Sequence, residues 1–151
     1  MILTGQGIRN DKAGFGYYGA PRSKTVDGKT VRYTHEGVDY ICTPGQLVCM
    51  PCTGRIVRLA YPYSDKSYGG VLIEAKRAML KVFYVEPYDG IVGRTFKIGD
   101  PIGIAQDVSK RYPGQGVTPH VHVQIDRCDP EILFKDLRSE ISDLKEKEIQ
   151  P

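Results

Sequence analysis

The chain has 151 residues, which is enough for one domain and too few for two of ordinary size. Its 21 Lys and Arg against 18 Asp and Glu give a net charge of +3 at pH 7, which is too small to indicate a nucleic-acid-binding protein. No stretch reaches the roughly 20 apolar residues of a membrane-spanning helix.

The charge is unevenly distributed along the chain. Residues 131–151 hold four Lys or Arg and six Asp or Glu, so the preceding residues carry a net charge of +5. A mildly basic body suits an anionic polymer as partner. The 17 Gly and 10 Pro are spread along the chain, which is typical of many turns between short strands.

The N-terminal 32 residues are rich in Gly, Tyr, Lys and Arg and show no sustained hydrophobic periodicity. We expect an arm or loop over residues 1–32 that lies on the surface of the domain that follows. The first six residues are not followed by the apolar segment of a signal peptide. This predicts either a protein that is not exported by that route or a mature form from which a leader has been removed.

Short apolar runs separated by turn residues fill residues 33–128, which we assign to one domain. The expected strands are Val38–Cys42, Gln46–Met50, Arg55–Tyr61, Val71–Ala75, Met79–Val85, Pro101–Ala105 and Pro119–Ile125. Successive strands are spaced by roughly ten residues, and no helical pattern lies between them. The pattern therefore predicts a mainly β fold, an antiparallel β-sandwich or barrel-like core.

Residues 129–151 follow a different pattern. Asp129 is placed as a helix N-cap, and Pro130 as the first helical residue. Apolar residues then recur at helical spacings: Leu133, Leu137, Ile141 and Leu144. This predicts one C-terminal amphipathic α-helix, which either packs against the sheet or serves for dimerisation or docking.

The four cysteines form a poor redox or zinc set. Cys49 and Cys52 make a CxxC pair, but the pair follows an expected strand, and Met50 precedes a proline, which favours extended backbone. Three extended residues span about 10 Å, beyond the ~7 Å that a disulfide allows between Cα atoms. We interpret the cysteines as small buried hydrophobic residues, and a disulfide through Cys42 or Cys128 stays open.

All three histidines fall in two short motifs, His35-Glu36-Gly37-Val38-Asp39 and His120-Val121-His122. On a strand, His120 and His122 point to the same side, so both imidazoles can converge on one ion. Imidazole nitrogen and carboxylate oxygen are both zinc ligands, and three protein ligands leave the fourth position open for water. The motifs therefore indicate a catalytic type of zinc site.

These two motifs and the residues between them resemble the lysostaphin-type (LytM-like) peptidoglycan zinc metallopeptidases, which carry HxGxD and HxH motifs on an antiparallel β core. The resemblance covers about residues 33–126. Segments similar to the strands and turns of that family are Pro44–Val48, Pro51–Val57 and Ile98–Gly103. Segments that look closest to its leukocyte cell-derived chemotaxin branch are Val38–Cys42, Phe83–Pro87, Tyr112–Gly114 and His120–His122.

The resemblance implies one Zn²⁺ ion held by His35, Asp39 and His122, with His120 as the base that polarises water for attack on a peptide carbonyl. It implies as substrate the peptide cross-links of bacterial peptidoglycan, an anionic cell-wall polymer. The site of action would then be extracytoplasmic, in the cell wall or periplasm. A chain without a signal peptide would fit a phage virion or tail component, or a mature secreted form.

One departure from the family bears on catalysis. The active peptidases carry a further histidine in a Tyr-x-His-Leu strand, whereas Tyr84 or Val85 occupies that place here. A Tyr84 hydroxyl could donate a hydrogen bond to an oxyanion. The chemotaxin branch shows the same loss and is regarded as zinc-binding and not a peptidase. Two functions therefore stay open: a zinc endopeptidase with His120 and Tyr84 as catalytic residues, and an inactive zinc-binding recognition protein.

Aromatic residues suggest where a substrate would lie. Tyr61, Tyr63 and Tyr88 are candidates to line a substrate groove. Ordinary aromatic side chains at a sheet edge explain them equally well.

Overall fold

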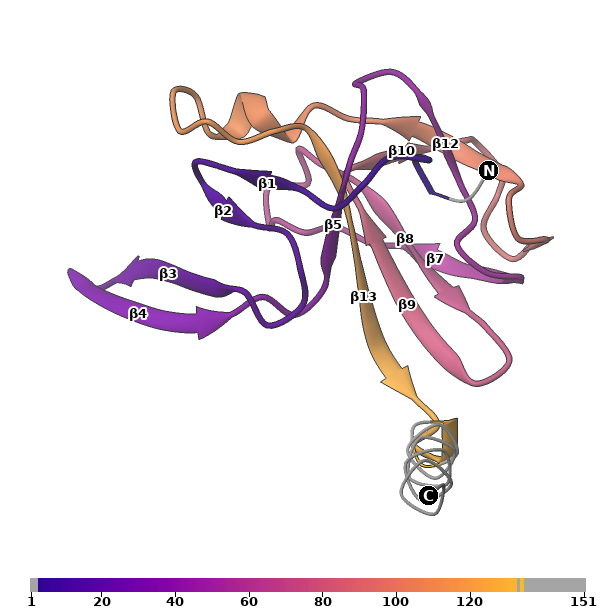
Figure 1. The fold of residues 1–151 in the computed structure, drawn as a ribbon. Helices are drawn as coiled ribbons and strands as arrows, with labels where there is room; N and C mark the ends of the chain where they lie inside the picture. Colours follow the sequence, from indigo (N-terminus) through magenta and orange to yellow (C-terminus); the bar gives the residue numbers. More distant parts are fainter. Residues whose placement is uncertain (1–2, 133, 135–151) are drawn as a thin grey trace, which may run out of the picture.

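The computed structural model describes residues 3–132 and residue 134, and the described chain is mainly β. Its largest sheet has six antiparallel strands in the order β11-β7-β8-β9-β13-β5 (Figure 1). These strands are β5 (Val38–Ile41), β7 (Gly54–Leu59), β8 (Gly70–Glu74), β9 (Ala78–Phe83), β11 (Thr95–Phe96) and β13 (His120–Cys128). Each strand of this sheet that the sequence predicts is present in the structure, and its ends differ from the predicted ones by at most a few residues.

A second antiparallel sheet has three strands in the order β10-β12-β6. They are β6 (Leu47–Cys49), β10 (Val85–Pro87) and β12 (Pro101–Ala105). Fully buried residues of both sheets form a single hydrophobic core, among them Val48, Ile56, Val82, Ile102 and Val121. The two sheets remain separate, so the core is a sandwich of antiparallel sheets and not a closed barrel.

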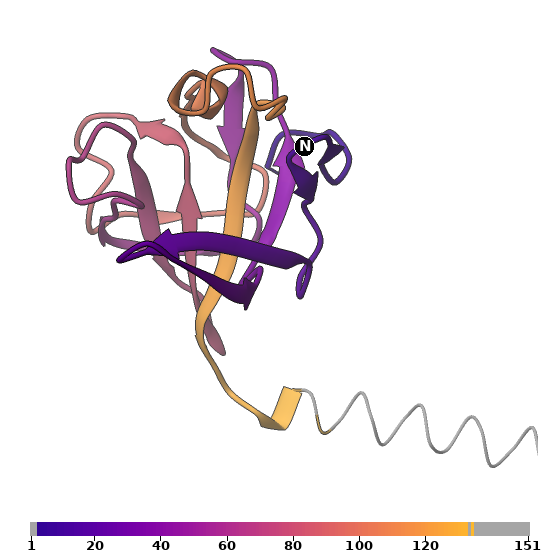
Figure 2. The ribbon, with the colours of Figure 1, turned by 90° about the vertical axis from the view of Figure 1, so that its left-hand side faces the viewer.

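Residues 3–34 contain two β-hairpins, in the region where the sequence predicts an arm or loop over residues 1–32. The first joins β1 (Asn10–Asp11) to β2 (Gly14–Phe15), and the second joins β3 (Pro21–Val26) to β4 (Lys29–Thr34). Asp27 and Gly28, at the turn of the second hairpin, both have positive φ (50° and 74°), as a two-residue type I′ turn requires. Figure 2, turned by 90° from Figure 1, shows the β3–β4 hairpin lying in front of β13 and projecting from the central sheet.

The segment before β1 also pairs with the core. Isolated bridges join Leu3 to Cys49 and Ile8 to Tyr40, so residues 3–16 run alongside β6 and β5. Both backbone groups of Asp39, in β5, are hydrogen-bonded to this segment: Arg9 N–H donates to Asp39 O (2.8 Å), and Asp39 N–H donates to Gly16 O (2.8 Å). The N-terminal segment therefore covers the outer edge of β5, where the HxGxD motif lies.

The C-terminal helix expected over residues 129–151 lies, apart from its first residues, outside the described part of the chain. The Asp129 carboxylate accepts a hydrogen bond from Glu131 N–H (2.9 Å), as an N-cap residue does. The longest helical element that the structure describes is the four-residue 3-10 turn η1 (Val108–Arg111). No helix among the described residues is long and apolar enough to cross a membrane.

The four cysteines are free thiols. Cys42 and Cys49 are buried in the hydrophobic interior, as a small apolar residue would be. Burial, together with the nearby Asp107 carboxylate, raises the pKa of the Cys42 thiol to about 11. A thiol with such a pKa is a poor nucleophile at neutral pH, which agrees with a packing role.

Candidate metal centre

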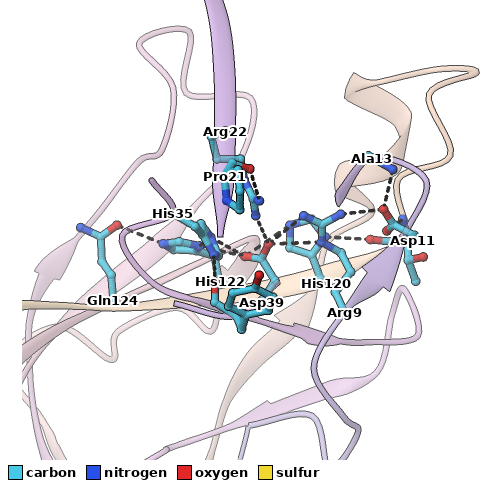
Figure 3. A network of polar contacts seen from close by, with 12 residues as sticks. Arg9, Asp11, Ala13, Pro21, Arg22, His35, Asp39, His120, His122 and Gln124 are labelled. Carbon is cyan, nitrogen blue, oxygen red and sulfur yellow. Dashed lines mark hydrogen bonds and ion pairs between the residues drawn. The ribbon is translucent and has the colours of Figure 1, made fainter. Parts of the chain in front are cut away.

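The two histidine motifs meet because β5 and β13 are neighbouring antiparallel strands. Their register places His122 directly opposite Asp39, and His120 opposite Ile41. His35 stands four residues before Asp39, at the end of the segment that leads into β5. Figure 3 shows the three imidazoles and the Asp39 carboxylate converging on one point.

The converging atoms are close together. Asp39 Oδ1 lies 3.2 Å from His35 Nε2 and 2.9 Å from His122 Nδ1, and these two nitrogens are 3.1 Å apart. His120 Nε2 is the fourth member, 3.7 Å from Asp39 Oδ1. His35, Asp39 and His120 are buried, whereas His122 is partly buried. Three of these residues form a group that could hold a metal ion within the described part of the chain: His35, Asp39 and His122.

Each imidazole is oriented from behind by an oxygen atom. The outer nitrogens contact these acceptors: His35 Nδ1 with Tyr17 O (3.1 Å), His120 Nδ1 with Thr118 O (2.7 Å) and His122 Nε2 with Gln124 Oε1 (3.0 Å). A carbonyl oxygen accepts only, so each outer nitrogen carries the proton of a neutral imidazole. The inner nitrogen then presents a lone pair to the centre, which is the arrangement that metal-binding histidines adopt.

This donor set fits a zinc ion. Lone pairs of the inner imidazole nitrogens face a carboxylate oxygen, so the groups repel one another unless a cation or a proton lies between them. Tetrahedral ligands at zinc distances of about 2.0–2.2 Å lie roughly 3.3–3.5 Å from one another, close to the separations found here. His35, Asp39 and His122 would hold the ion, and His120 stands beside it.

Arginines secure the opposite side of the Asp39 carboxylate. Arg9 donates to Asp39 Oδ2 through Nε (3.2 Å) and Nη2 (3.1 Å), and Arg22 Nη2 lies 3.5 Å from the same oxygen. Arg9 Nη1 also donates to Asp11 Oδ1 (2.8 Å), and Asp11 Oδ2 accepts from Thr118 N–H (2.8 Å). Because the arginines occupy Oδ2, Oδ1 is left to face the histidines.

The electrostatics keep the site in its metal-binding state near neutral pH. Burial raises the pKa of Asp39, but its close polar contacts with the imidazoles of His122 and His35 and the nearby His120 lower it by more, so the pKa lies well below its usual range. Burial lowers the pKa of His120 from its usual 6.5. Asp39 is therefore a carboxylate, and His120 is a neutral imidazole at pH 7.

The glycine of the HxGxD motif allows the two strands to approach. A Cβ on Gly37 would lie 2.4 Å from Val123 O and 2.7 Å from His122 Nε2 and Cε1. Such distances are well inside van der Waals contact, so a side chain here would displace the His122 ring.

An open cleft of about 290 Å³ gives access to the centre. Its lining includes the metal-binding set, His120, Arg9, Arg22, Tyr33, Tyr84 and Tyr112. The N-terminal segment forms one wall through Arg9 and Ala13 and leaves the cleft open. Solvent and ligand can therefore reach the point on which the histidines converge.

Of the two residues that the resemblance places where the active peptidases carry a further histidine, Tyr84, and not Val85, faces the cleft. Val85 is fully buried in the core, whereas Tyr84 lines the cleft with its ring edge-on to His120 at 5.3 Å between centroids. Tyr84 has φ of 68°, an unfavourable backbone conformation for an aromatic residue. This conformation, between β9 and β10, turns the side chain out of the strand and towards the site.

Tyr84 belongs to a chain of hydrogen-bonded hydroxyls. Tyr63 Oη lies 3.1 Å from Tyr84 Oη and 2.6 Å from Tyr112 Oη. Burial raises the pKa of Tyr84 to about 12, and burial with these hydrogen bonds also raises the pKa of Tyr63. Three hydroxyls make two hydrogen bonds with one another, so one hydroxyl proton is left for a further acceptor.

The other aromatic candidates lie elsewhere. Tyr63 stands behind Tyr84 and supports it without lining the cleft. Tyr61 and Tyr88 are partly exposed and do not line the cleft either, and Lys66 Nζ covers the Tyr61 ring at 5.2 Å. The structure thus brings together His35, Asp39, His120, His122 and Tyr84, and it leaves Tyr61 and Tyr88 apart.

Sequence reasoning missed the residues that orient the ligands. Gln124 has a signal in the sequence, since it follows His120 and His122 at strand period 2 and so shares their face. Arg9 and Asp11 have no such signal in the sequence. Only the tertiary fold brings Arg9 to Asp39 and Asp11 to Thr118.

Comparison with known structures defines the class. The catalytic domain of the antimicrobial peptidase lysostaphin from Staphylococcus simulans matches with a TM-score of 0.52 and 23% identity, over 80% of this chain and 90% of that domain. A zinc-containing peptidase from Vibrio cholerae matches with a TM-score of 0.53 and 17% identity, over 82% of this chain and 36% of the other. The fold is that of the lysostaphin-type peptidases.

Sequence relatives define the family. Leukocyte cell-derived chemotaxin-2 of Mus musculus is 35% identical over 125 residues, which span 80% of this chain and 74% of the relative. The Bos taurus protein of the same name is 32% identical over 129 residues, 82% of this chain and 76% of the relative. Myeloid protein 1 of Gallus gallus is 33% identical over 128 residues, 80% of this chain and 35% of the relative. No family model matches the chain.

The chain belongs to the leukocyte cell-derived chemotaxin-2 family. The long span of the match to the Mus musculus and Bos taurus relatives establishes this membership. The lysostaphin-type fold is the one that the HxGxD and HxH motifs indicate, and the family is the branch that segments such as Val38–Cys42 and Phe83–Pro87 resemble.

Proposed function

We propose that this protein binds one zinc ion through His35, Asp39 and His122 and hydrolyses peptide bonds, with peptidoglycan cross-links as substrate. One observation carries the proposal: His120 Nε2 presents a free lone pair 3.7 Å from Asp39 Oδ1, beside the metal-binding set and in an open cleft. An ion-binding site alone needs no fourth imidazole in this position.

The bound zinc would supply Lewis acidity, which lowers the pKa of water and stabilises negative charge on a carbonyl oxygen. His120 acts as the general base: Nε2 takes a proton from the water that attacks the peptide carbonyl, because Thr118 O holds the other proton on Nδ1. His120 then passes this proton to the amine nitrogen that leaves when the C–N bond breaks. The backbone carbonyl of Thr118 keeps the ring in this orientation throughout. Burial keeps His120 neutral before the reaction, so the base is ready at pH 7.

Tyr84 donates a hydrogen bond to the developing oxyanion. Its high pKa keeps the hydroxyl protonated, and if Tyr112 donates to Tyr63 and Tyr63 donates to Tyr84, the proton of Tyr84 is free for the substrate. Removal of one such donor lowers the rate by about 10²–10³. The mildly basic body suits the anionic wall polymer, and we place the site of action outside the cytoplasm.

A second function, zinc-dependent recognition without turnover, is favoured by family membership. The relatives that match over most of their length are chemotaxins, whereas the peptidases share the fold at 23% identity or less. In this case His120 and Tyr84 would contribute to a rigid polar surface beside the ion.

A cell-wall digestion assay separates the two functions. Purified peptidoglycan is incubated with zinc-loaded protein, new amino groups are counted, and the metal content of the same sample is measured. We expect about one zinc per chain, loss of zinc in His122→Ala, and loss of amine release in His120→Ala with zinc retained. In Tyr84→Phe the release should fall by about 10²–10³. Zinc binding without any amine release would refute the peptidase and leave the recognition function.

A further inference from the structure

The β3–β4 hairpin presents a basic face that continues the wall of the zinc cleft. In this two-stranded ladder, directly opposed residues share a face, and Arg22 stands opposite Tyr33, and Lys24 opposite Val31. The pair nearest the tip on the same face is Val26 with Lys29. Arg22 and Tyr33, at the base of the hairpin, also line the zinc cleft, so the face and the cleft form one surface.

The hairpin is directly connected to the metal centre, because β4 ends at Thr34 and the next residue is His35. The backbone of His35 continues the ladder, since Gly19 N–H donates to His35 O and His35 N–H donates to Ala20 O, both at 2.8 Å. Each strand of six residues is about 20 Å long at about 3.4 Å per residue. The surface therefore extends from a zinc ligand for the length of a short extended peptide.

The charge on this face has one sign. Arg22, Lys24 and Lys29 lie on it, and the nearest acid of the hairpin, Asp27, is in the turn. Neither Lys24 nor Lys29 makes an ion pair within the part of the chain that the structure describes. Lys24 Nζ instead lies 5.4 Å from the centre of the Tyr33 ring. Exposed cations without counter-charges attract an anionic ligand.

Apolar side chains separate the cations on this face. Val26, Val31 and Tyr33 are 43%, 40% and 45% exposed, so they cover no hydrophobic core of their own. Both strands also pair only with each other among the described residues, which leaves backbone donors and acceptors at their outer edges. Alternating cations and apolar groups beside an open strand edge suit an extended peptide better than a sugar chain, which offers no backbone to pair with a strand.

We propose that this face binds the acidic flank of a peptide whose neighbouring residues lie in the zinc cleft. The inference rests on the proposed function for the path of the peptide into the cleft, but the contact itself needs no zinc. The carboxylates of the peptide would pair with Lys24 and Lys29, the two cations of this face that make no ion pair among the described residues. The hairpin thus selects substrates or partners by charge, at a distance from the metal centre.

Fluorescence anisotropy with a labelled peptide tests the proposal. The probe is fluorescein-labelled Ala-Ala-Ala-Glu-Glu-Glu-Glu, and the matched control peptide has Gln in place of each Glu. We expect the acidic peptide to bind at least tenfold more tightly than the control. The double variant Lys24→Gln with Lys29→Gln should lose this preference. Arg32→Glu makes the same net charge change on the other face of the hairpin, where Arg32 stands opposite Ser23, and should retain the preference.

Three results would overturn the proposal. They are equal binding of the two peptides, equal loss in Arg32→Glu and in the double variant, and binding of the anionic polysaccharide polygalacturonate in place of the acidic peptide. The His122→Ala variant and metal analysis keep this test apart from the proposed function. Peptide preference retained in His122→Ala supports the hairpin site, and an absence of zinc in the unmodified protein would refute only the metal centre.

Discussion

Replacement of Arg9 by methionine tests how far the metal centre depends on the N-terminal segment. Arg9 is 5% exposed, and it donates two hydrogen bonds to Asp39 Oδ2 and one to Asp11 Oδ1. Methionine keeps most of the buried stem but removes the guanidinium, so both carboxylates lose their main counter-charge. Asp39 retains only Arg22 on that side, at 3.5 Å.

The magnitude follows from the burial of the pair. Removal of one partner from a buried ion pair leaves a buried charge without compensation, which lowers the free energy of unfolding by about 3–5 kcal/mol. The loss also frees the Asp39 carboxylate to rotate, and a lost contact of this kind lowers metal affinity by about 10–100-fold. Arg22→Met is the matched control, since a single partly exposed contact at 3.5 Å is expected to contribute about 1 kcal/mol or less.

Urea unfolding of the zinc-free proteins measures the first effect, and competition with a chelator measures the second. The reasoning would be refuted if Arg9→Met unfolded within about 1 kcal/mol of the unmodified protein, or if Arg22→Met were the more damaging of the two. A loss of stability with unchanged zinc affinity would show that Arg9 supports the fold and does not orient Asp39.

Two further predictions concern the same centre. Gly37→Ala should leave a folded protein, because β5 lies at an edge of the sheet. The new Cβ would displace the His122 ring, so zinc affinity should fall at least tenfold. Circular dichroism checks the fold and metal titration checks the affinity, and full zinc binding would contradict the close approach of Gly37 to His122. The lowered pKa of His120 means that its neutral form persists to lower pH than in a free histidine, so the rate of peptide hydrolysis should fall only below pH 6.5. A fall that begins above pH 6.5 would show that the base is not the buried His120.

The central strands were predictable because each combines a short apolar run with turn residues at both ends. The seven runs from Val38 to Ile125 all have counterparts in the two sheets. Short connections explain why β7, β8 and β9 are antiparallel neighbours, whereas β13 pairs with β9 and β5 across long connections that the sequence pattern did not predict. The β3–β4 hairpin was missed although Asp27-Gly28 is a typical type I′ turn sequence. Its strands are polar and exposed, so they lack the alternation of apolar residues on which the assignment of strands depended.

The converging residues of the site were predictable from motif spacing, because strand period 2 puts His120 and His122 on one face. Their orientation was not, since Arg9 and Tyr17 act on Asp39 and His35 from segments that carry no motif. The placement of the aromatic candidates relative to the cleft was not predictable for the same reason. Whether Tyr61 or Tyr84 reaches the cleft depends on local backbone geometry, such as the positive φ of Tyr84, which composition does not encode.

The spacing of the metal-binding residues along the chain has a consequence for folding. His35 and His122 are separated by 87 positions, yet they share one centre. An ion held by both would close a loop of that length, and ordering so long a loop in the unfolded chain is entropically unfavourable. Since the ion binds the native arrangement, the apparent stability of the domain would rise with free zinc concentration, by about 2.7 kcal/mol at 100 times the dissociation constant. The free zinc concentration would then determine the fraction of folded protein as well as the occupancy of the metal centre.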